Sequence, residues 1–512
     1  MGYKEFQIKI HTDYTEIELR QTIQQKLGIQ DFTFQVFSKS LDARNKRNIL
    51  WELRVGVTSE SIPGVSPEEK ATLKIPYTKT GKKALVIGSG PAGYFAARIL
   101  LQAGFKTTLW ERGKDVAERA AAISSFEKGG AFDAAGNYSF GEGGAGTFSD
   151  GKLTSRSKHI SLEKKYILDT YIGAGAPPEI AWLSHPHVGS DNLKKVVKTL
   201  REEFCAMGGE FVFNRQMTDL IVKNGKVTGV VAGNEIFEPD IVILAIGHSA
   251  LDTCRMLMDR GVRFRTKNFA IGFRAEHRQE IINTAQWGVK TLPGVKAAEY
   301  RLTSDAADQP VYTFCMCPGG KIVPAAAFEN TNIVNGMSYF ARNGKFANAA
   351  CVAGLNPDVL AGKNIGPEDA LNYLEKLETS FHDFANGYAA PYCSIQDFIQ
   401  KKVRQNSPPD SSYPLGLLQA PLWKMLPETV THAIRLGLQD FCRKVKGYDT
   451  GMLIGLESKT SSPIQVIRQE NGLCEGFENL YMAGEGSGYS GGIISSAVDG
   501  IKVAMMAVSK FQ

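Results

Sequence analysis

The chain has 512 residues, of which 43% are hydrophobic and 22% charged, and its formal net charge is +6. This length predicts two or three domains, and the near-average composition disfavours intrinsic disorder. The small positive excess contains no dense basic run, so we expect no nucleic-acid partner.

The sequence also lacks the features of a membrane or exported protein. It has no apolar stretch of about eighteen residues or more, and its first residues lack the apolar core of a secretory signal. Eight cysteines in so long a chain do not predict a disulfide framework. We therefore expect a cytoplasmic protein without a membrane partner. No histidine lies in a zinc-binding pattern, so no metal site is predicted, and the sequence leaves the oligomeric state open.

The N-terminal part of the chain predicts a small βαββ unit. Alternating apolar residues at 3–10 predict a strand, and an amphipathic helix is expected at Glu16–Leu27. Two more strands are expected at Phe32–Phe37 and Ile49–Val57. The polar, proline-containing stretch Ser59–Lys82 then predicts a linker. Because nothing before this linker carries obvious chemistry, an accessory or packing role is expected for the unit.

A dinucleotide-binding fingerprint follows the linker. A short apolar strand at 84–87 leads into a glycine-rich turn and a helix expected to end near Ala103. In such a setting the first glycine permits a tight turn, the second lets a phosphate approach the backbone, and the third lets the helix pack on the strand. The residues expected to bind the dinucleotide here are Gly88, Gly90, Pro91, Ala92 and Gly93.

The dinucleotide-binding fingerprint usually includes an acidic residue at the end of the second strand, and this sequence has one. The next strand, 106–110, is followed by Glu111, 18 residues after Gly93. A carboxylate at that place can accept a hydrogen bond from a ribose hydroxyl. We include the adjacent Arg112 among the expected cofactor contacts.

NAD and FAD both fit this half-site, and three later segments favour FAD. The glycine-rich loop 140–147 suits close approach by a flat, bulky ring system. The buried strand at 240–247, which follows an Asn224-Gly225 hairpin, ends in small residues. In 480–494, a strand, an acid and a glycine pair precede a helix whose N-terminus can face the flavin. The residues of these segments expected to contact FAD are Gly143, Gly144, Thr147, Asp150, Ala245, Ile246, Gly247, Gly484, Glu485, Gly491, Gly492 and Ile493.

Together these segments resemble the FAD-binding half of the glutathione-reductase and fumarate-reductase superfamily. More narrowly, the chain resembles the bacterial family of uncharacterised FAD-dependent dehydrogenases, through the strings at 141–153, 314–320 and 484–492. Ile246 replaces the Thr that is usual in the superfamily, and Glu485 replaces the usual Asp. The resemblance spans nearly the whole chain and implies the fold and the FAD cofactor, but no substrate.

We therefore predict an α/β fold with a discontinuous Rossmann-type FAD-binding domain, an inserted α+β substrate or cap lobe, and a small N-terminal βαββ domain. The expected divisions are 1–75 for the N-terminal domain, 82–255 with 450–512 for the FAD-binding domain, and 256–449 for the inserted lobe. A ligand is expected between the lobe and the glycine-rich segments, because ligands gather at domain interfaces.

The sequence lacks the motifs of two classes of flavoprotein. No second G-x-G-x-x-G in a strand–turn–helix setting occurs between residues 250 and 480, so a dedicated nicotinamide domain is not expected. A nicotinamide can still serve as an electron donor without one. The segment 128–152 contains no cysteine, which disfavours the disulfide reductases that carry a Cys pair shortly after the second strand.

The candidates for substrate chemistry are Lys152, Cys315, Cys317 and Lys321. Lys152 follows the flavin loop and can reach the cofactor or the substrate, or else it belongs to a solvated turn. The two cysteines would share one face of a strand, too far apart for a relaxed disulfide, and their alternative role is as small buried residues. Pro318–Lys321 predicts a turn in which Lys321 could meet an anionic group, and a plain hairpin is the alternative.

Three further groups of polar residues are weaker candidates. His185 and His187 are expected to be a pair of loop histidines. The charged segment Arg274–Arg278 predicts a solvated face. Glu457–Pro463 precedes the last flavin segment and could line a pocket.

These observations predict an FAD-dependent oxidoreductase, a dehydrogenase or reductase, that acts on a small anionic or unsaturated molecule. Two alternatives stay open. One is a flavoprotein monooxygenase on the same scaffold. The other is a non-catalytic FAD-binding protein that senses metabolites or recruits a partner through its N-terminal unit.

Overall fold

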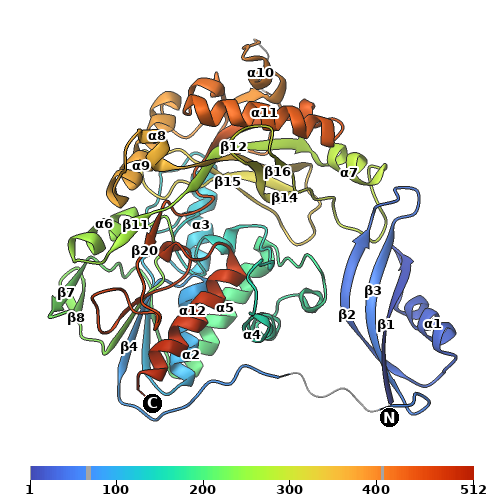
Figure 1. Cartoon of the computed structure of the whole chain (residues 1–512), viewed down its shortest axis with the longest axis horizontal. Helices are drawn as coiled ribbons and strands as arrows, with labels where there is room; N and C mark the ends of the chain where they lie inside the picture. The colour runs from blue at the N-terminus through green and yellow to red at the C-terminus, as the bar shows by residue number, and fades with distance from the viewer. Residues whose placement is uncertain (1, 65–70, 405–408, 512) are drawn as a thin grey trace.

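The computed structural model describes residues 2–64, 71–404 and 409–511, so residues 65–70 of the predicted linker lie outside the described chain. The fold is mixed α/β, as predicted. Figure 1 shows a parallel sheet with helices against it, a large sheet beneath a layer of helices at the top, and a small separate sheet at the right.

The N-terminal unit has the three strands and the helix predicted for it. Strands β1 (Gly2–His11), β2 (Thr33–Asp42) and β3 (Leu50–Ser59) pair antiparallel in the order β1-β3-β2, and α1 (Glu16–Leu27) packs against them. The helix begins with a capping box in which Thr15 and Glu18 satisfy each other's backbone N–H groups.

The five-stranded sheet is entirely parallel and has the order β21-β10-β4-β5-β6. Its strands are β4 (Lys83–Ile87), β5 (Lys106–Trp110), β6 (Glu210–Val212), β10 (Ile241–Leu244) and β21 (Leu480–Met482). The carboxyl ends of parallel strands lie along one edge. The loops after β4, β5, β10 and β21, which carry the predicted FAD contacts, therefore meet there.

Side-chain alternation along β4 shows why both faces of this sheet are covered. Ala84 and Val86 pack into a core formed by helices, whereas Leu85 and Ile87 pack into a second core beneath a three-stranded antiparallel sheet. The helices are α2 (Pro91–Gln102), α4 (Ser161–Gly173), α5 (Ser190–Ala206) and α12 (Ile493–Ser509). The covering strands are β7 (Asp219–Lys223), β8 (Lys226–Ala232) and β9 (Glu235–Phe237).

The eight-stranded sheet follows the order β13-β14-β16-β12-β19-β17-β18, and β15 pairs with β14 outside this path. Its strands are β12 (Phe269–Arg278), β13 (Thr303–Ser304), β14 (Val311–Pro324), β15 (Val334–Met337), β16 (Phe346–Leu355), β17 (Ala390–Ser394), β18 (Leu417–Gln419) and β19 (Met452–Glu457). Helices near it are α7 (Gln279–Trp287), α9 (Pro367–Ala385), α10 (Ile395–Gln400) and α11 (Glu428–Lys444).

Shorter elements join these layers. Strand β11 (Phe264–Thr266) pairs antiparallel with β20 (Ile464–Val466), which links the chain entering the large sheet to the chain leaving it. The connecting helices are α3 (Val116–Glu127), α6 (Leu251–Asp259) and α8 (Pro357–Ala361). How the chain divides into domains stays a prediction. In the described ranges, no helix has both the length and the apolarity needed to cross a bilayer.

Two sequence expectations about the large sheet are wrong. Pro318–Lys321 is not a turn, because β14 runs through it and changes partner from β16 to β15. A Cβ on Gly320 would lie 2.3 Å from the Met337 carbonyl oxygen, so the glycine permits a close strand crossing rather than a reversal. Arg274–His277 is not a solvated face, since β12 lies between β16 and β19 and buries Arg274, Glu276 and His277.

The core of the large sheet provides a test of its packing. Phe273 on β12 is fully buried and meets the ring of Phe398 edge to face at 5.6 Å. We expect Phe273→Ala to lower the free energy of unfolding by about 3–5 kcal/mol, because it leaves a cavity in a close-packed core. Chemical denaturation followed by far-ultraviolet circular dichroism measures this change. The exposed Val359→Ala is the control, and an equal loss in both variants would contradict the packing.

Candidate functional site

Four glycine-containing segments meet at the carboxyl edge of the parallel sheet, and we refer to the place where they meet as the glycine groove. A Cβ added to Gly88 would lie 2.3 Å from the Ala245 carbonyl oxygen, which brings the loops after β4 and β10 together. A Cβ on Gly144 would lie 3.0 Å from the Cα atom of Gly90, which brings the second glycine loop against the first. Only glycine allows approaches this close.

The last predicted segment closes the same groove. A Cβ on Gly484 would lie 2.7 Å from the Ala92 side chain, and one on Gly146 would lie 3.1 Å from Ile493. The structure thus brings the fingerprint, the loop 141–147, the end of β10 and the N-terminus of α12 together. Figure 1 shows α2 and α12 side by side, beginning at this edge.

Gly90 differs from the other glycines of the groove because the protein's own packing does not require it. Its φ of −63° and ψ of 177° suit any residue. Within the described chain, the nearest heavy atom to an added Cβ is the Gly144 Cα at 3.8 Å. Helix α2 begins here with Pro91 and without a side-chain cap from the described residues, so the N–H groups of its first turn remain available. This is the arrangement that a pyrophosphate needs.

Glu111 connects three of the segments. Its carboxylate accepts hydrogen bonds from the Ser89 N–H at 2.9 Å and the Ser89 hydroxyl at 2.7 Å. It also accepts from the N–H groups of Gly113 at 2.9 Å and Gly141 at 3.1 Å. These four bonds fill the lone-pair positions of a carboxylate. A bond from Glu111 to a ribose hydroxyl stays a prediction, and it requires the Ser89 hydroxyl to turn away.

The neighbouring Arg112 is held by the protein. Its guanidinium pairs with both carboxylate oxygens of Asp252 at 3.0 Å and lies 4.0 Å from the centre of the Phe140 ring. Thr147 donates its hydroxyl to the Glu142 carbonyl oxygen at 3.1 Å. These side chains shape the wall of the groove.

On the other side of the groove, an added Cβ on Gly247 or Gly492 would meet open space within the described chain. Glu485 lies beside this space, and its carboxylate is 3.5 Å from Nδ1 of His248. Nε2 of His248 is buried and has no hydrogen-bond partner among the described residues. A buried polar atom at this place can bond a ligand or a water molecule.

A buried charged cluster begins directly after the second glycine loop. Asp150 is 1% exposed and accepts from Arg342 at 2.6 and 3.0 Å, from Lys152 at 2.8 Å and from the Ser338 hydroxyl. Burial opposes ionisation of Asp150, but Lys152 and Arg342 outweigh it and hold its pKa well below the ordinary value. Asp150 therefore fixes Lys152, which also donates to the Met316 carbonyl oxygen on β14.

Arg274 on β12 and Glu457 on β19 form the second part of this cluster. The pair is fully buried, with 2.6 Å between Nη1 and Oε2. Burial raises the pKa of Glu457 to about 7 despite the nearby guanidinium. Arg274 also donates to the Cys315 carbonyl oxygen at 2.6 Å and lies 3.7 Å from the Cys317 sulfur.

Three of the four residues predicted for substrate chemistry thus lie together. Lys152, Cys315 and Cys317 share this cluster. Lys321 does not, because its ammonium pairs with Glu127 at 2.9 and 3.0 Å. Cys315 has a left-handed φ of 44°, and the strand register shifts between Phe314 and Cys317, so the regular alternation assumed for the cysteines is interrupted.

The two loop histidines have different surroundings. His185 is exposed and pairs with Glu299. His187 is 3% exposed and lies 3.0 Å through Nε2 from the Phe340 carbonyl oxygen. Burial lowers the pKa of His187 to about 4, so it is neutral near pH 7. Neither imidazole contacts the glycine groove in the described structure, and both lie beside the Asp150–Arg342 pair.

Residues 268–460, which contain most of the large sheet, match the family model described as "FAD-dependent protein, C-terminal domain-like". An uncharacterised protein of Clostridium beijerinckii (strain ATCC 51743 / NCIMB 8052) is 38% identical over 495 residues, which cover 93% of this chain and 92% of that protein. The chain belongs to this family of FAD-dependent proteins. FAD is its cofactor.

Solved structures of flavoproteins are only distantly similar to this flavoprotein. They include the flavin-dependent brominase Bmp2, with 12% identity, a TM-score of 0.38 and coverage of 85% of this chain and 80% of that one. The tetracycline destructase Tet(51) has 15% identity, a TM-score of 0.36 and coverage of 84% and 82%. A geranylgeranyl bacteriochlorophyll reductase-like protein from Thermoplasma acidophilum has 13% identity, a TM-score of 0.35 and coverage of 84% and 79%. Similarity this weak indicates nothing about substrate.

The residues of the groove fit FAD. Gly90 offers a cradle that a single Cβ would fill, and α2 supplies unbonded N–H groups beside it. Gly247 and Gly492 border open space, and the orphaned Nε2 of His248 is at the same edge. These residues would hold the pyrophosphate and the flavin portion of the cofactor.

Sequence reasoning missed two residues of this site. His248 directly follows Gly247, and its place at the carboxyl end of a parallel strand was a usable signal. Arg274 was assigned to a solvated face because its strand carries charged residues, and only the strand order reveals that it is central.

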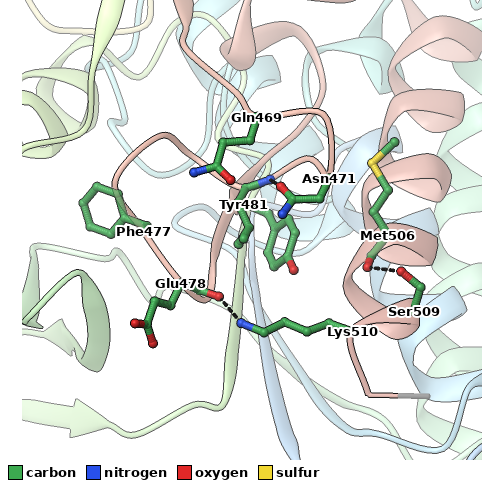
Figure 2. A pocket seen from close by; sticks show the side chains of 9 residues that line it. Gln469, Asn471, Phe477, Glu478, Tyr481, Met506, Ser509 and Lys510 are labelled. Atoms are coloured by element: carbon green, nitrogen blue, oxygen red, sulfur yellow. Dashed lines mark hydrogen bonds between the residues drawn. The ribbon is translucent and has the colours of Figure 1, made fainter.

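The flavoprotein also has a cavity that lies away from the glycine groove. A cavity of about 470 Å³ lies between the loop before β21 and the C-terminal end of α12, and Tyr481, Met506 and Lys510 line it together with Gln469 and Asn471 (Figure 2). Because it lies at the amino end of β21, it opens at the sheet edge opposite to the glycine segments.

Gly90→Ala separates cofactor binding from folding. The added methyl fits the backbone and the space around Gly90, but it occupies the place where a phosphate approaches. We expect FAD affinity to fall at least about tenfold, with the melting temperature of the apoprotein unchanged. Flavin fluorescence titration and calorimetry measure the two quantities. Gly93→Ala is the contrast: its Cβ would lie 1.8 Å from the Gly88 carbonyl oxygen, so it should lower apoprotein stability. Unchanged FAD binding by Gly90→Ala would contradict the cradle.

Asp150→Asn tests the buried charge cluster. It leaves Arg342 and Lys152 without their carboxylate, so we expect a loss of roughly 3–5 kcal/mol of stability at pH 7. The folded-state pKa of Asp150 is depressed, so its stabilisation is present above the unfolded value near 3.8 and is lost as pH falls below it. Denaturation of both proteins between about pH 3 and pH 7 measures the difference. A constant or growing difference toward low pH would refute this assignment.

Proposed function

We propose that this flavoprotein is a dehydrogenase or reductase that exchanges a hydride or electron pair between FAD and a small anionic or unsaturated molecule. The observation that carries the proposal is the junction of the glycine groove with the buried cluster. Lys152 lies six residues after Gly146 in the chain, and its ammonium is fixed against β14 of the large sheet.

Contacts between the two sides support a substrate position at this junction. Lys267, next to β12, donates to the Gly488 carbonyl oxygen at 2.7 Å. Ser190 donates its hydroxyl to the Thr147 carbonyl oxygen and its N–H to that of Ser338, both at 3.1 Å. These hydrogen bonds join segments next to the large sheet to the loops of the groove, and a substrate enclosed between them would be shielded from water, which strengthens electrostatic interactions.

The cofactor, when bound, supplies the redox chemistry, and the chain supplies orientation, charge and protons. Lys152 keeps its positive charge, because the Asp150 carboxylate outweighs the effect of burial and raises the pKa of Lys152. It can hold an anionic group of the substrate. His248 offers an imidazole whose Nε2 can accept or donate a proton, and Glu485 orients its other nitrogen.

A spectrum and a substrate screen test this function. The purified protein should release FAD that is identified by mass, and anaerobic photoreduction should bleach the bound flavin. Mixing the reduced protein anaerobically with a panel of unsaturated carboxylates and 2-oxo acids, or the oxidised protein with hydroxy acids, should reveal turnover. Oxygen incorporated into a compound under air would instead identify a monooxygenase. A bound flavin that responds to none of these compounds would favour a non-catalytic role.

Lys152→Met tests the substrate position. With a carboxylate that perturbs the spectrum of bound FAD, we expect the Kd to rise roughly tenfold to hundredfold, because a charge-assisted hydrogen bond is lost. The FAD content should stay unchanged. Absorbance titration measures the Kd, and the exposed Lys165→Met is the matched control. An identical Kd in both variants would remove Lys152 from the site.

A further inference from the structure

Two cysteines of the large sheet are arranged differently from cysteines on a regular strand. Alternate residues of an extended strand lie roughly 7 Å apart, whereas a disulfide needs Cβ atoms about 3.5–4.5 Å apart. The left-handed φ of 44° at Cys315 and the register shift after Phe314 interrupt this spacing. The Cys317 thiol lies 3.4 Å from the Cys315 carbonyl oxygen. The backbone therefore bends the pair together rather than holding it extended.

The strained backbone is held by cations. Arg274 donates to the Cys315 carbonyl oxygen and lies 3.7 Å from the Cys317 sulfur, and Lys152 donates to the carbonyl oxygen of Met316 between them. Non-glycine residues with positive φ persist only where surrounding contacts enforce them, and they concentrate at functional sites. Both fixed charges also favour a thiolate over a thiol.

The two thiols have different accessibility and acidity. Cys315 is partly exposed, whereas Cys317 is 0% exposed. A hydrogen bond from Cys317, together with the charges of Arg274 and Lys152, lowers the pKa of Cys315 to about 5. The same interaction and burial raise the pKa of Cys317. By contrast, burial raises the pKa of Cys254 and of Cys351 to about 12 each. One accessible thiolate beside one buried thiol is the arrangement of an attacking and a resolving cysteine.

The pair also lies toward the flavin groove. The Glu457 carboxylate is close enough to feel the charges of both Cys315 and His248. His248 follows Gly247, which borders the open side of the groove. Lys152 comes from the second glycine loop and reaches the backbone between the two cysteines. The second glycine loop therefore contacts the backbone between the two thiols.

We propose that Cys315 and Cys317 are a redox dithiol–disulfide pair that exchanges an electron pair with the bound FAD. In the forward direction an S–S bond forms between the two sulfurs, the Cys317 S–H bond breaks, and its proton passes with the electron pair to the flavin. The cysteines are oxidised and FAD becomes the anionic reduced form. The reverse reaction cleaves the disulfide and oxidises the flavin. The inference rests on FAD binding but not on the substrate class proposed above.

Anaerobic titration of the holoprotein tests the pair. After oxidation with diamide and removal of the reagent, the wild-type protein should consume about four electrons per FAD from dithionite, because flavin and disulfide each take a pair. Cys315→Ser and Cys317→Ser should each consume about two. Cys205→Ser, which changes an exposed cysteine elsewhere, should keep the wild-type value. Consumption of about two electrons by the diamide-treated wild-type protein would overturn the proposal.

A second measurement needs no variant and no activity. Trypsin releases residues 302–321 as one peptide that contains both cysteines. In diamide-treated protein this peptide should carry an internal disulfide by mass spectrometry, and in dithionite-reduced protein it should be alkylated twice. At about pH 6, iodoacetamide should modify Cys315 before any other cysteine, and Lys152→Met should slow this reaction. A reduced peptide after oxidation would refute the pair even if every variant failed to fold.

Discussion

The groove exists because backbone atoms meet where a side chain does not fit. Gly88 faces the end of β10, Gly144 faces Gly90, and Gly484 faces α2, each at a distance that a Cβ would make too short. These contacts join residues that are 54 to 392 positions apart in the chain, so the groove forms only when the chain has folded. A long, thin ligand that presents phosphates and a flat ring suits such a surface, since backbone N–H groups can then replace side chains as donors.

Beside this side-chain-poor groove, the protein concentrates buried charge. Arg274 with Glu457, and Asp150 with Arg342, are ion pairs removed from water. A buried ion pair is weak evidence for stability, because desolvation offsets much of the attraction. Its presence at the junction therefore indicates a functional reason. Here each pair fixes a group that would otherwise move: Asp150 positions Lys152, and Arg274 holds the strained backbone at Cys315.

The local features of the fold were predictable from the sequence, because each depends on residues close together in the chain. The strand before Gly88, the uncapped helix after it and the hairpin at Asn224-Gly225 follow from apolar pattern and turn chemistry. The N-terminal helix was predicted from its amphipathic pattern with its observed ends, and the structure shows Thr15 and Glu18 capping its start and Gly28 its end.

The two wrong predictions both concern the large sheet, because the order of its strands cannot be read from the local sequence pattern. Nothing near Arg274 indicates that β12 lies between β16 and β19, so its charged residues suggested a surface strand. Pro318–Lys321 was wrongly predicted to be a turn for the same reason. In the sequence, glycines that permit two strands to cross closely cannot be distinguished from glycines that permit a chain reversal. The convergence of Lys152 with the two cysteines depends on β14 and was likewise visible only in the fold.

The N-terminal unit bears on how the two sides of the site stay together. Its strand β2 makes a short parallel bridge in which the Lys39 N–H donates to the Trp182 carbonyl oxygen at 2.8 Å. That contact lies on the segment that leads to His185 and His187. Elsewhere Lys46 donates to the Ala285 carbonyl oxygen in α7 at 2.6 Å, next to the large sheet. One small sheet thus contacts both the segment beside the parallel sheet and the helix beside the large one. The charged cluster spans the same two sides, so the N-terminal unit connects from outside the two parts of the protein that meet at Lys152.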